Sequence, residues 1–99
     1  MNFEKLEEQV LAWAGERNLL NKDNIKSQAL KMVSEVGELC DGIVKGNEDE
    51  VIDGIGDVII TLIILAKQME LNPVLCLNVA YQEIKNRKGK TIDGAFVKN

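Results

Sequence analysis

Residues 31–66 read KMVSEVGELCDGIVKGNEDEVIDGIGDVIITLIILA, and this stretch decides the fold of the chain. Apolar residues recur at helical spacing on both sides of Gly46 and Asn47, which predicts two helices joined at that pair. Five acidic residues lie beside the most apolar run of the chain: Glu35, Glu38, Glu50, Asp53 and Asp57. Carboxylates crowded next to a core repel one another and lose hydration, so such a cluster is typical of a cation site or of proton chemistry.

Length and composition indicate one domain that spans residues 1–99, because 99 residues with 45% apolar composition suffice for one core. The net charge of −4 argues against binding a nucleic-acid polymer through a broad basic face. The chain contains no histidine, so catalysis has to use carboxylates, Lys, Tyr, Cys or a bound metal ion.

The cysteines indicate a reducing compartment. Cys40 and Cys76 lie in expected helices among apolar neighbours, which favours reduced core thiols and a cytoplasmic protein. The acidic N-terminus does not resemble a signal peptide. The longest apolar run, residues 58–66, is shorter than the ~18 residues of a membrane helix, so no membrane partner is expected.

An amphipathic helix is expected over residues 2–17, with Asn2 as its N-cap. Trp13 and Phe3 are either core residues, as aromatics on an apolar helix face mostly are, or a surface on which a nucleobase stacks. The polar segment 18–24 is predicted to be a connection that ends with a cap at Asp23 or Asn24.

The second helix is expected over residues 25–45, closed by Gly46. Its predicted core face consists of Ile25, Ala29, Met32, Val33, Val36, Leu39, Cys40 and Ile43. A polar stripe flanks this face and consists of Gln28, Lys31, Glu35 and Glu38. Taken alone, the stripe favours a solvated surface with an ion pair between Lys31 and Glu35.

The third helix is expected from Asn47, which with Glu50 resembles a capping box, to about Leu71. Glu50, Asp53 and Asp57 share one stripe that continues into aliphatic residues, which indicates that other helices cover it. Residues 58–66 are apolar on every side except at Thr61. A helix of this kind is buried on all sides, and one short chain has few helices to surround it, so a homo-oligomer is predicted.

The fourth helix is expected over residues 73–88, ending at Gly89, after an Asn72 cap and Pro73. Its predicted core residues are Val74, Leu77, Tyr81 and Ile84. Lys85, Lys88 and Arg87 either compensate the helix dipole or bind phosphate. In the tail, Asp93 and Gly94 are typical of a hairpin turn.

The acidic cluster therefore predicts a magnesium site that handles a polyphosphate. Oxygen ligands suit Mg²⁺ or Mn²⁺, which bind through a few carboxylates and substrate phosphates.

With its Glu35-x-x-Glu38 pair and a second acidic helix that ends in Gly56, Asp57 and Val58, the chain resembles the MazG-like family of all-α nucleoside triphosphate pyrophosphohydrolases. The family pattern is E-x-x-E, a spacer and E-x-x-D on two antiparallel helices of a four-helix bundle. Residues 35–38 match the first half, and Asp57 matches the final Asp. Gly54 stands where the pattern has its second-half Glu, so Asp53, the preferred candidate, or Glu50 has to supply that carboxylate.

The resemblance implies an all-α, antiparallel four-helix bundle completed by oligomerisation as a homodimer or homotetramer, with a short C-terminal tail. It also implies Mg²⁺-dependent hydrolysis of NTP or dNTP to the monophosphate and pyrophosphate. Glu35, Glu38, Asp53 and Asp57, or Glu50, are the expected metal ligands, and Glu38 or Glu35 is expected to orient the attacking water. The expected substrate-binding residues are Trp13, Gln28, Lys31, Tyr81, Lys85 and Arg87.

Two alternatives remain open from the sequence. A non-catalytic helical dimerisation module explains the apolar run and leaves the acids solvated. An enzyme of the same fold that acts on another pyrophosphate linkage, such as that of phosphoribosyl-ATP, shares the metal ligands.

Overall fold

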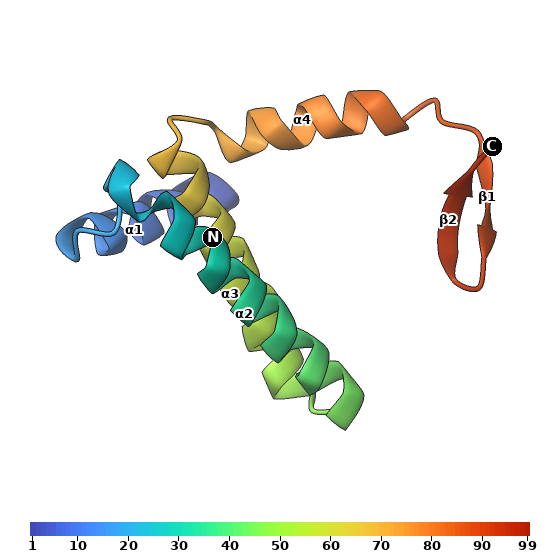
Figure 1. Cartoon of the computed structure of the whole chain (residues 1–99), viewed down its shortest axis with the longest axis horizontal. Coiled ribbons are helices and arrows are strands. Elements are labelled where there is room, and N and C mark those ends of the chain that lie inside the picture. The colour runs from blue at the N-terminus through green and yellow to red at the C-terminus, as the bar shows by residue number, and fades with distance from the viewer.

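The computed structural model describes residues 1–99, which form four helices followed by one β-hairpin (Figure 1). The sequence predicts an all-α chain, and this is confirmed in part, because the chain is mostly helical but also carries a small two-stranded sheet. The helices are α1 (Phe3–Glu16), α2 (Ile25–Lys45), α3 (Glu48–Gln68) and α4 (Pro73–Ile84), and the strands are β1 (Gly89–Ile92) and β2 (Ala95–Lys98). None of the helices combines the length and apolar composition needed to cross a membrane.

Asparagine side chains cap three of the helices, as the sequence predicts. Asn2, Asn47 and Asn72 each accept hydrogen bonds from backbone N–H groups in the first turn of the helix that follows. Before α2, however, the cap belongs to Asn21, which precedes a 3₁₀ turn over Lys22–Asn24, and Asn24 makes no capping hydrogen bond. Gly46 ends α2 in the left-handed region at φ 69°, where a side chain is disfavoured.

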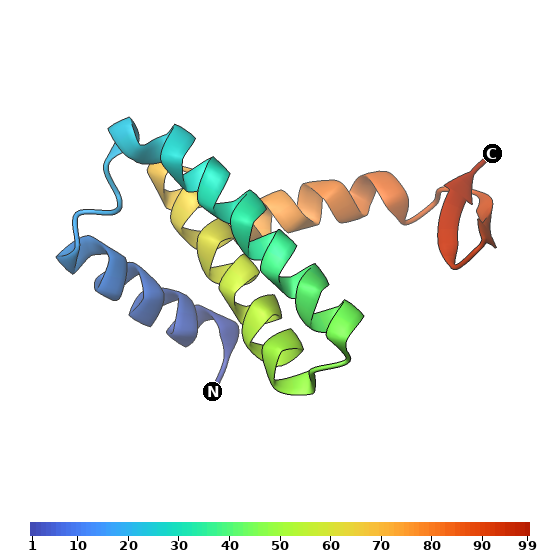
Figure 2. The ribbon, with the colours of Figure 1, turned by 60° about the horizontal axis from the view of Figure 1, so that its bottom comes forward.

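An antiparallel pair of long helices, α2 and α3, forms the centre of the molecule, and α1 packs on α3 (Figure 2). Close approach of the pair requires Gly54, because a Cβ there would lie 3.1 Å from Leu39 Cα. The small apolar core consists of Ala14, Ile63 and Ile64. Gln68 is also buried, and its side-chain Nε2 donates a hydrogen bond of 2.7 Å to the carbonyl oxygen of Leu19.

The core face predicted for α2 is partly wrong. Val33, Val36, Cys40 and Ile43 are exposed, whereas Glu35 and Gly42 are buried. The side of α2 that packs on α3 is therefore shifted by about one residue from the apolar stripe. Glu35 and Gly42 take part in this contact beside Leu39, so hydrophobic periodicity alone misplaced it.

The prediction that the cysteines are core thiols is also wrong. Cys40 and Cys76 are both free, and both are exposed within this chain. Cys40 belongs to the misplaced stripe of α2, and Cys76 lies on α4, which no other helix covers.

The fourth helix departs most from expectation. α4 ends at Ile84 instead of Lys88, and it extends away from the other three helices (Figures 1 and 2). Val74, Leu77, Tyr81 and Ile84, predicted to be core residues, are all more than half exposed. The backbone turns at Glu70, whose φ is 59°, and Asn72 then starts α4 in the new direction. One chain alone therefore does not form a four-helix bundle.

The hydrophobic run of α3 is covered on one side only. Thr61, Ile63 and Ile64 are buried, but Ile59 and Leu62 remain more than 40% exposed. The coverage on all sides that the sequence predicts is thus not reached within one chain, and the homo-oligomer stays a prediction.

The tail forms the two-stranded hairpin that the Asp93–Gly94 pair predicts. Both turn residues have positive φ, 50° and 79°, as a tight two-residue hairpin turn requires. Gly89, expected to follow the last helix, instead begins β1 opposite Lys98.

Candidate active site

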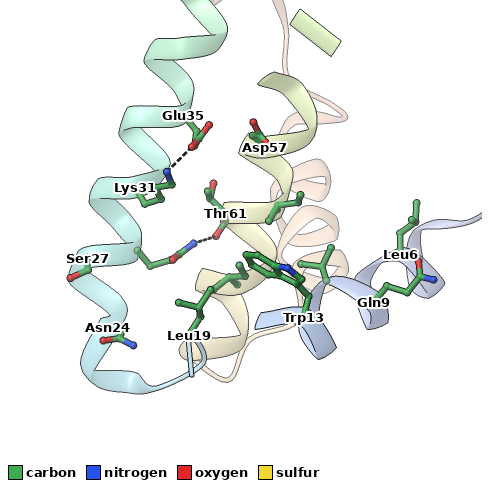
Figure 3. A pocket seen from close by; sticks show the side chains of 14 residues that line it. Leu6, Gln9, Trp13, Leu19, Asn24, Ser27, Lys31, Glu35, Asp57 and Thr61 are labelled. Carbon is green, nitrogen blue, oxygen red and sulfur yellow. Dashed lines mark hydrogen bonds and ion pairs between the residues drawn. The ribbon is translucent and has the colours of Figure 1, made fainter. Parts of the chain in front are cut away.

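An open pocket of about 830 Å³ lies where α1, α2 and α3 meet (Figure 3). Its apolar wall comes from α1, the following connection and α3, and includes Leu6, Val10, Leu19, Ile60 and Ile64. Its polar residues come mainly from α2 and α3: Asn24, Ser27, Gln28, Lys31, Glu35, Asp57 and Thr61. The pocket therefore joins an apolar surface to a charged edge.

Lys31 and Glu35 form the ion pair that their spacing predicts. Lys31 Nζ lies 2.9 Å from Glu35 Oε1, and the contact raises the pKa of Lys31. Glu35 is buried, and its second oxygen, Oε2, has no hydrogen-bond partner. A buried carboxylate oxygen without a partner is costly, so this atom is suited to an additional cation or proton donor.

Asp57 faces Glu35 from the opposite helix (Figure 3). Its pKa is raised above the ordinary value, first by burial and then by the negative charges of Asp53 and Glu35. A bound cation would stabilise the ionised carboxylate of Asp57. Its positive charge would offset both the burial and the neighbouring negative charges.

Gln28 links the two central helices. Its Nε2 donates a hydrogen bond of 3.2 Å to the carbonyl oxygen of Thr61, whose hydroxyl donates to the Val58 carbonyl oxygen at 2.7 Å. Gln28 therefore lines the pocket but also holds α2 against α3.

A second, smaller hollow of about 280 Å³ lies toward the turn between α2 and α3. It has no hydrophobic lining residue and is formed by Glu38, Asp41, Lys45, Glu50, Asp53, Gly54 and Asp57. Asp57 lines both hollows and so marks the point where the apolar pocket meets the acidic one.

The structure gives a reason for the glycine at the family's Glu position. Gly54 is buried, and Leu39 occupies the space that any larger side chain at position 54 would need. Of the two candidate replacements, Asp53 contributes to the raised pKa of Asp57, whereas Glu50 lies 3.9 Å from Lys45 Nζ in an ion pair.

The residues expected at the site fall into three groups. Trp13, Gln28, Lys31, Glu35 and Asp57 line the large pocket. Glu38, Glu50 and Asp53 line the acidic hollow with Asp57.

Tyr81, Lys85 and Arg87 form the third group and line neither hollow, because α4 carries them away from the other helices (Figure 1).

Several lining residues escaped the sequence analysis, namely Gln9, Asn24, Ser27 and Asp41. Ser27 precedes Lys31 by four residues, so helical spacing places both on one side of α2. Asp41 similarly follows Glu38 by three residues. Spacing could have found both, whereas Gln9 depends on how α1 docks.

The candidate ligands are of the type that Mg²⁺ or Mn²⁺ prefers, because they are carboxylates on facing helices. One of their oxygens, Glu35 Oε2, is buried and has no hydrogen-bond partner. In this structure no group of three or more acidic or cysteine side chains lies close enough together to hold one ion. Binding of one ion by three of these side chains would therefore require side-chain rotations.

Comparison with known proteins identifies the family of the chain. The profile of the MazG nucleotide pyrophosphohydrolase domain matches residues 23–90. An uncharacterized 18.2 kDa protein from Haemophilus phage HP1, encoded in the rep-hol intergenic region, is 36% identical over 74 residues. That alignment covers 75% of this chain but 45% of the phage protein, and no solved structure matches. The profile match covers both acidic helices and most of the chain, which therefore belongs to the MazG nucleotide pyrophosphohydrolase family.

Proposed function

We propose that the chain hydrolyses nucleoside triphosphates, NTP or dNTP, to the monophosphate and pyrophosphate in the presence of Mg²⁺. The observation that carries this proposal is the junction at Asp57 between an apolar pocket and an acidic hollow. A nucleotide has the same division, because its base is flat and largely apolar while its phosphates are anionic and bind metal ions.

The metal would be held by Glu35, Glu38, Asp53 and Asp57, which line the two hollows. When bound, Mg²⁺ or Mn²⁺ supplies polarisation of the phosphoryl oxygens and a water of lowered pKa. Glu38, whose exposed carboxylate lines the acidic hollow, would orient the attacking water or accept its proton. Lys31 is the cation in the large pocket and contacts the phosphate chain.

The nucleoside lies against Trp13 in the apolar pocket. The Arg17 guanidinium lies over the Trp13 ring at 4.4 Å from its centroid, a cation–π contact. Trp13 nevertheless remains 47% exposed beside the pocket, so an indole surface is available to a base. Asn24 and Ser27 offer hydrogen-bonding groups nearby.

The proposed form is a homodimer or homotetramer in a reducing compartment such as the cytoplasm. Exposed aliphatic residues on α3 favour an oligomer, and two free cysteines suit reducing conditions.

Product analysis tests the function directly. Each common NTP and dNTP, and separately phosphoribosyl-ATP, is incubated with the protein and Mg²⁺. The products are separated as monophosphate, diphosphate, phosphate and pyrophosphate. We expect monophosphate and pyrophosphate in equal amounts. Hydrolysis of phosphoribosyl-ATP alone would assign the other pyrophosphate linkage.

The controls for this assay are Glu38→Ala and Asp57→Ala. Both variants should lose activity if their carboxylates hold the metal. Full activity in both would show that these two carboxylates do not hold the catalytic metal ion. No hydrolysis of any substrate by the unchanged chain would support the non-catalytic helical module.

Metal binding should also be visible without any substrate. Mg²⁺ or Mn²⁺ is expected to raise the melting temperature of the unchanged protein, because an ion that binds only the native state stabilises it. The double variant Glu38→Gln, Asp57→Asn should respond little, and differential scanning fluorimetry measures both. Equal shifts in the two proteins would indicate non-specific screening.

A further inference from the structure

Lys31 is the only cationic residue that lines the large pocket. Its ammonium lies 2.9 Å from Glu35 Oε1, at the edge of the pocket where Glu35 and Asp57 face each other from α2 and α3 (Figure 3). A positive charge in this place favours the ionised form of both carboxylates, as a bound metal ion would. The ammonium of Lys31 therefore lies among the candidate metal ligands themselves.

The negative charges around Lys31 come from both central helices. The hydrogen bond with Glu35 and the charge of Glu35 contribute most to the raised pKa of Lys31, and the charges of Glu38 and Asp57 add to it, while partial burial opposes the change. All three acids are candidate metal ligands. The ammonium thus lies in the region of negative potential that is expected to attract Mg²⁺ or Mn²⁺.

A single ammonium leaves the carboxylates of this region incompletely paired. Glu35 is only 7% exposed, and its Oε2 has no hydrogen-bond partner although Lys31 contacts Oε1. Burial and then the charges of Asp53 and Glu35 raise the pKa of Asp57. A buried carboxylate oxygen without a partner is costly, so the arrangement favours a cation of higher charge that contacts several oxygens at once.

The two partners of the ion pair differ in their freedom to move. The side chain of Lys31 is 61% exposed, whereas that of Glu35 is 9% exposed. The flexible stem of a lysine lets its ammonium reach several partners, while a buried side chain is held by close packing. Two cations at one carboxylate repel each other, so a metal ion that binds Glu35 would displace Lys31 more readily than it would move Glu35.

The pocket offers the displaced ammonium a second partner under the proposed function. Lys31 lines the same pocket as Trp13, where the nucleoside is proposed to lie, and as Asp57, where the acidic hollow begins. A phosphate chain that runs from the nucleoside to the metal ligands crosses the part of the pocket that Lys31 lines. An ammonium released from Glu35 can bind its oxygens.

We propose that a divalent metal ion and Lys31 exchange at Glu35: the ion displaces the ammonium, and the released ammonium binds the phosphate chain of the substrate. Lys31 thus weakens metal binding when no nucleotide is present and strengthens nucleotide binding once the metal has entered. The two ligands are coupled, because each one separates the ion pair and so frees a partner for the other. The contact with phosphate rests on the proposed function, whereas the exchange with the metal ion does not.

Calorimetric titration with Mn²⁺ alone tests the exchange. The variant is Lys31→Met, because methionine keeps an unbranched side chain without the charge. We expect Lys31→Met to bind Mn²⁺ about tenfold more tightly than the unchanged chain, as follows if the ion pair leaves roughly one molecule in ten competent to bind. Mn²⁺ binding that is unchanged or weaker in a folded Lys31→Met would overturn the exchange.

Lys45→Met is the matched control. Lys45 lies on the same helix, lines the acidic hollow and is 3.9 Å from Glu50, but it does not contact Glu35. The substitution removes the same charge, so it should tighten Mn²⁺ binding by at most about twofold at about 0.15 M salt, where distant exposed charges are largely screened. Equal tightening in the two variants would indicate general attraction between charges and would also overturn the exchange.

Lys31→Arg keeps the test decisive if circular dichroism shows that Lys31→Met does not fold. A guanidinium is always charged and can donate to both oxygens of a carboxylate, so it should hold Glu35 more firmly than the ammonium does. We therefore expect Lys31→Arg to bind Mn²⁺ more weakly than the unchanged chain. Equal or tighter binding in Lys31→Arg would contradict the exchange.

Nucleotide binding should change in the opposite direction. The α,β-methylene analogues of the common nucleoside triphosphates resist cleavage at the proposed bond, so their binding can be measured with Mn²⁺ present. We expect Lys31→Met to bind them about tenfold more weakly, as loss of a charged hydrogen bond predicts. Equal binding of an analogue by the two proteins would overturn the contact with phosphate. If no analogue binds the unchanged chain, the proposed function fails, and the titrations with Mn²⁺ alone still decide the exchange.

Discussion

Asp53→Ala is expected to lower Mg²⁺-dependent hydrolysis by ~100-fold or more, because it removes a proposed metal ligand. Asp53 lines the acidic hollow with Asp57, and its charge contributes to the raised pKa of Asp57. No other carboxylate can replace it from position 54, where a glycine is buried against Leu39. The loss should appear in kcat and in the concentration of Mg²⁺ needed for half-maximal rate.

Glu50→Ala is the matched comparison and should lose far less. The capping hydrogen bond of Glu50 uses its backbone N–H, which donates to Asn47 Oδ1 at 3.2 Å and survives the substitution. What disappears is an exposed ion pair with Lys45, which contributes at most about 1 kcal/mol to stability. A larger loss of activity in Glu50→Ala than in Asp53→Ala would make Glu50 the ligand. The metal site would then lie one turn closer to Gly46.

Three of the four helix caps were predictable because they depend on neighbouring residues. Asn2, Asn47 and Asn72 cap the helices that the sequence assigns to them, and Gly46 ends α2 in the left-handed conformation. The position of α4 was not predictable in the same way. Its apolar residues require cover, but nothing in its sequence states whether its own chain or another molecule provides that cover.

The contact between α2 and α3 was harder to predict because it is not the most hydrophobic side of α2. Glu35 and Gly42 are buried there while Val33 and Ile43 remain exposed. The acidic stripes were found nonetheless, because the spacing of Glu35 and Asp57 along their helices does not depend on which side is most apolar. Lys85 and Arg87 could not be placed, since their position depends on α4.

Gly54→Glu, which introduces the acid of the family pattern, is expected to destabilise the protein by roughly 3 kcal/mol or more. A Cβ at this position would lie 3.1 Å from Leu39 Cα and 3.2 Å from both Leu39 Cβ and Cδ1. Overpacking of this kind costs roughly 1–3 kcal/mol, and burying a charged carboxylate against Leu39 adds to that cost. Urea denaturation, followed by helical circular dichroism, measures the change.

Gly56→Ala provides the control in the same helix, because a Cβ there meets nothing within 4 Å. It should be neutral or stabilise the protein by up to ~1 kcal/mol, since alanine favours the helix over glycine. The double variant Asp53→Ala, Gly54→Glu completes the test. If it were stable and active, α2 and α3 could separate enough to admit a ligand at position 54, and the packing explanation for Gly54 would be wrong. We expect it to be inactive, because the acid at position 54 cannot enter the site without displacing Leu39.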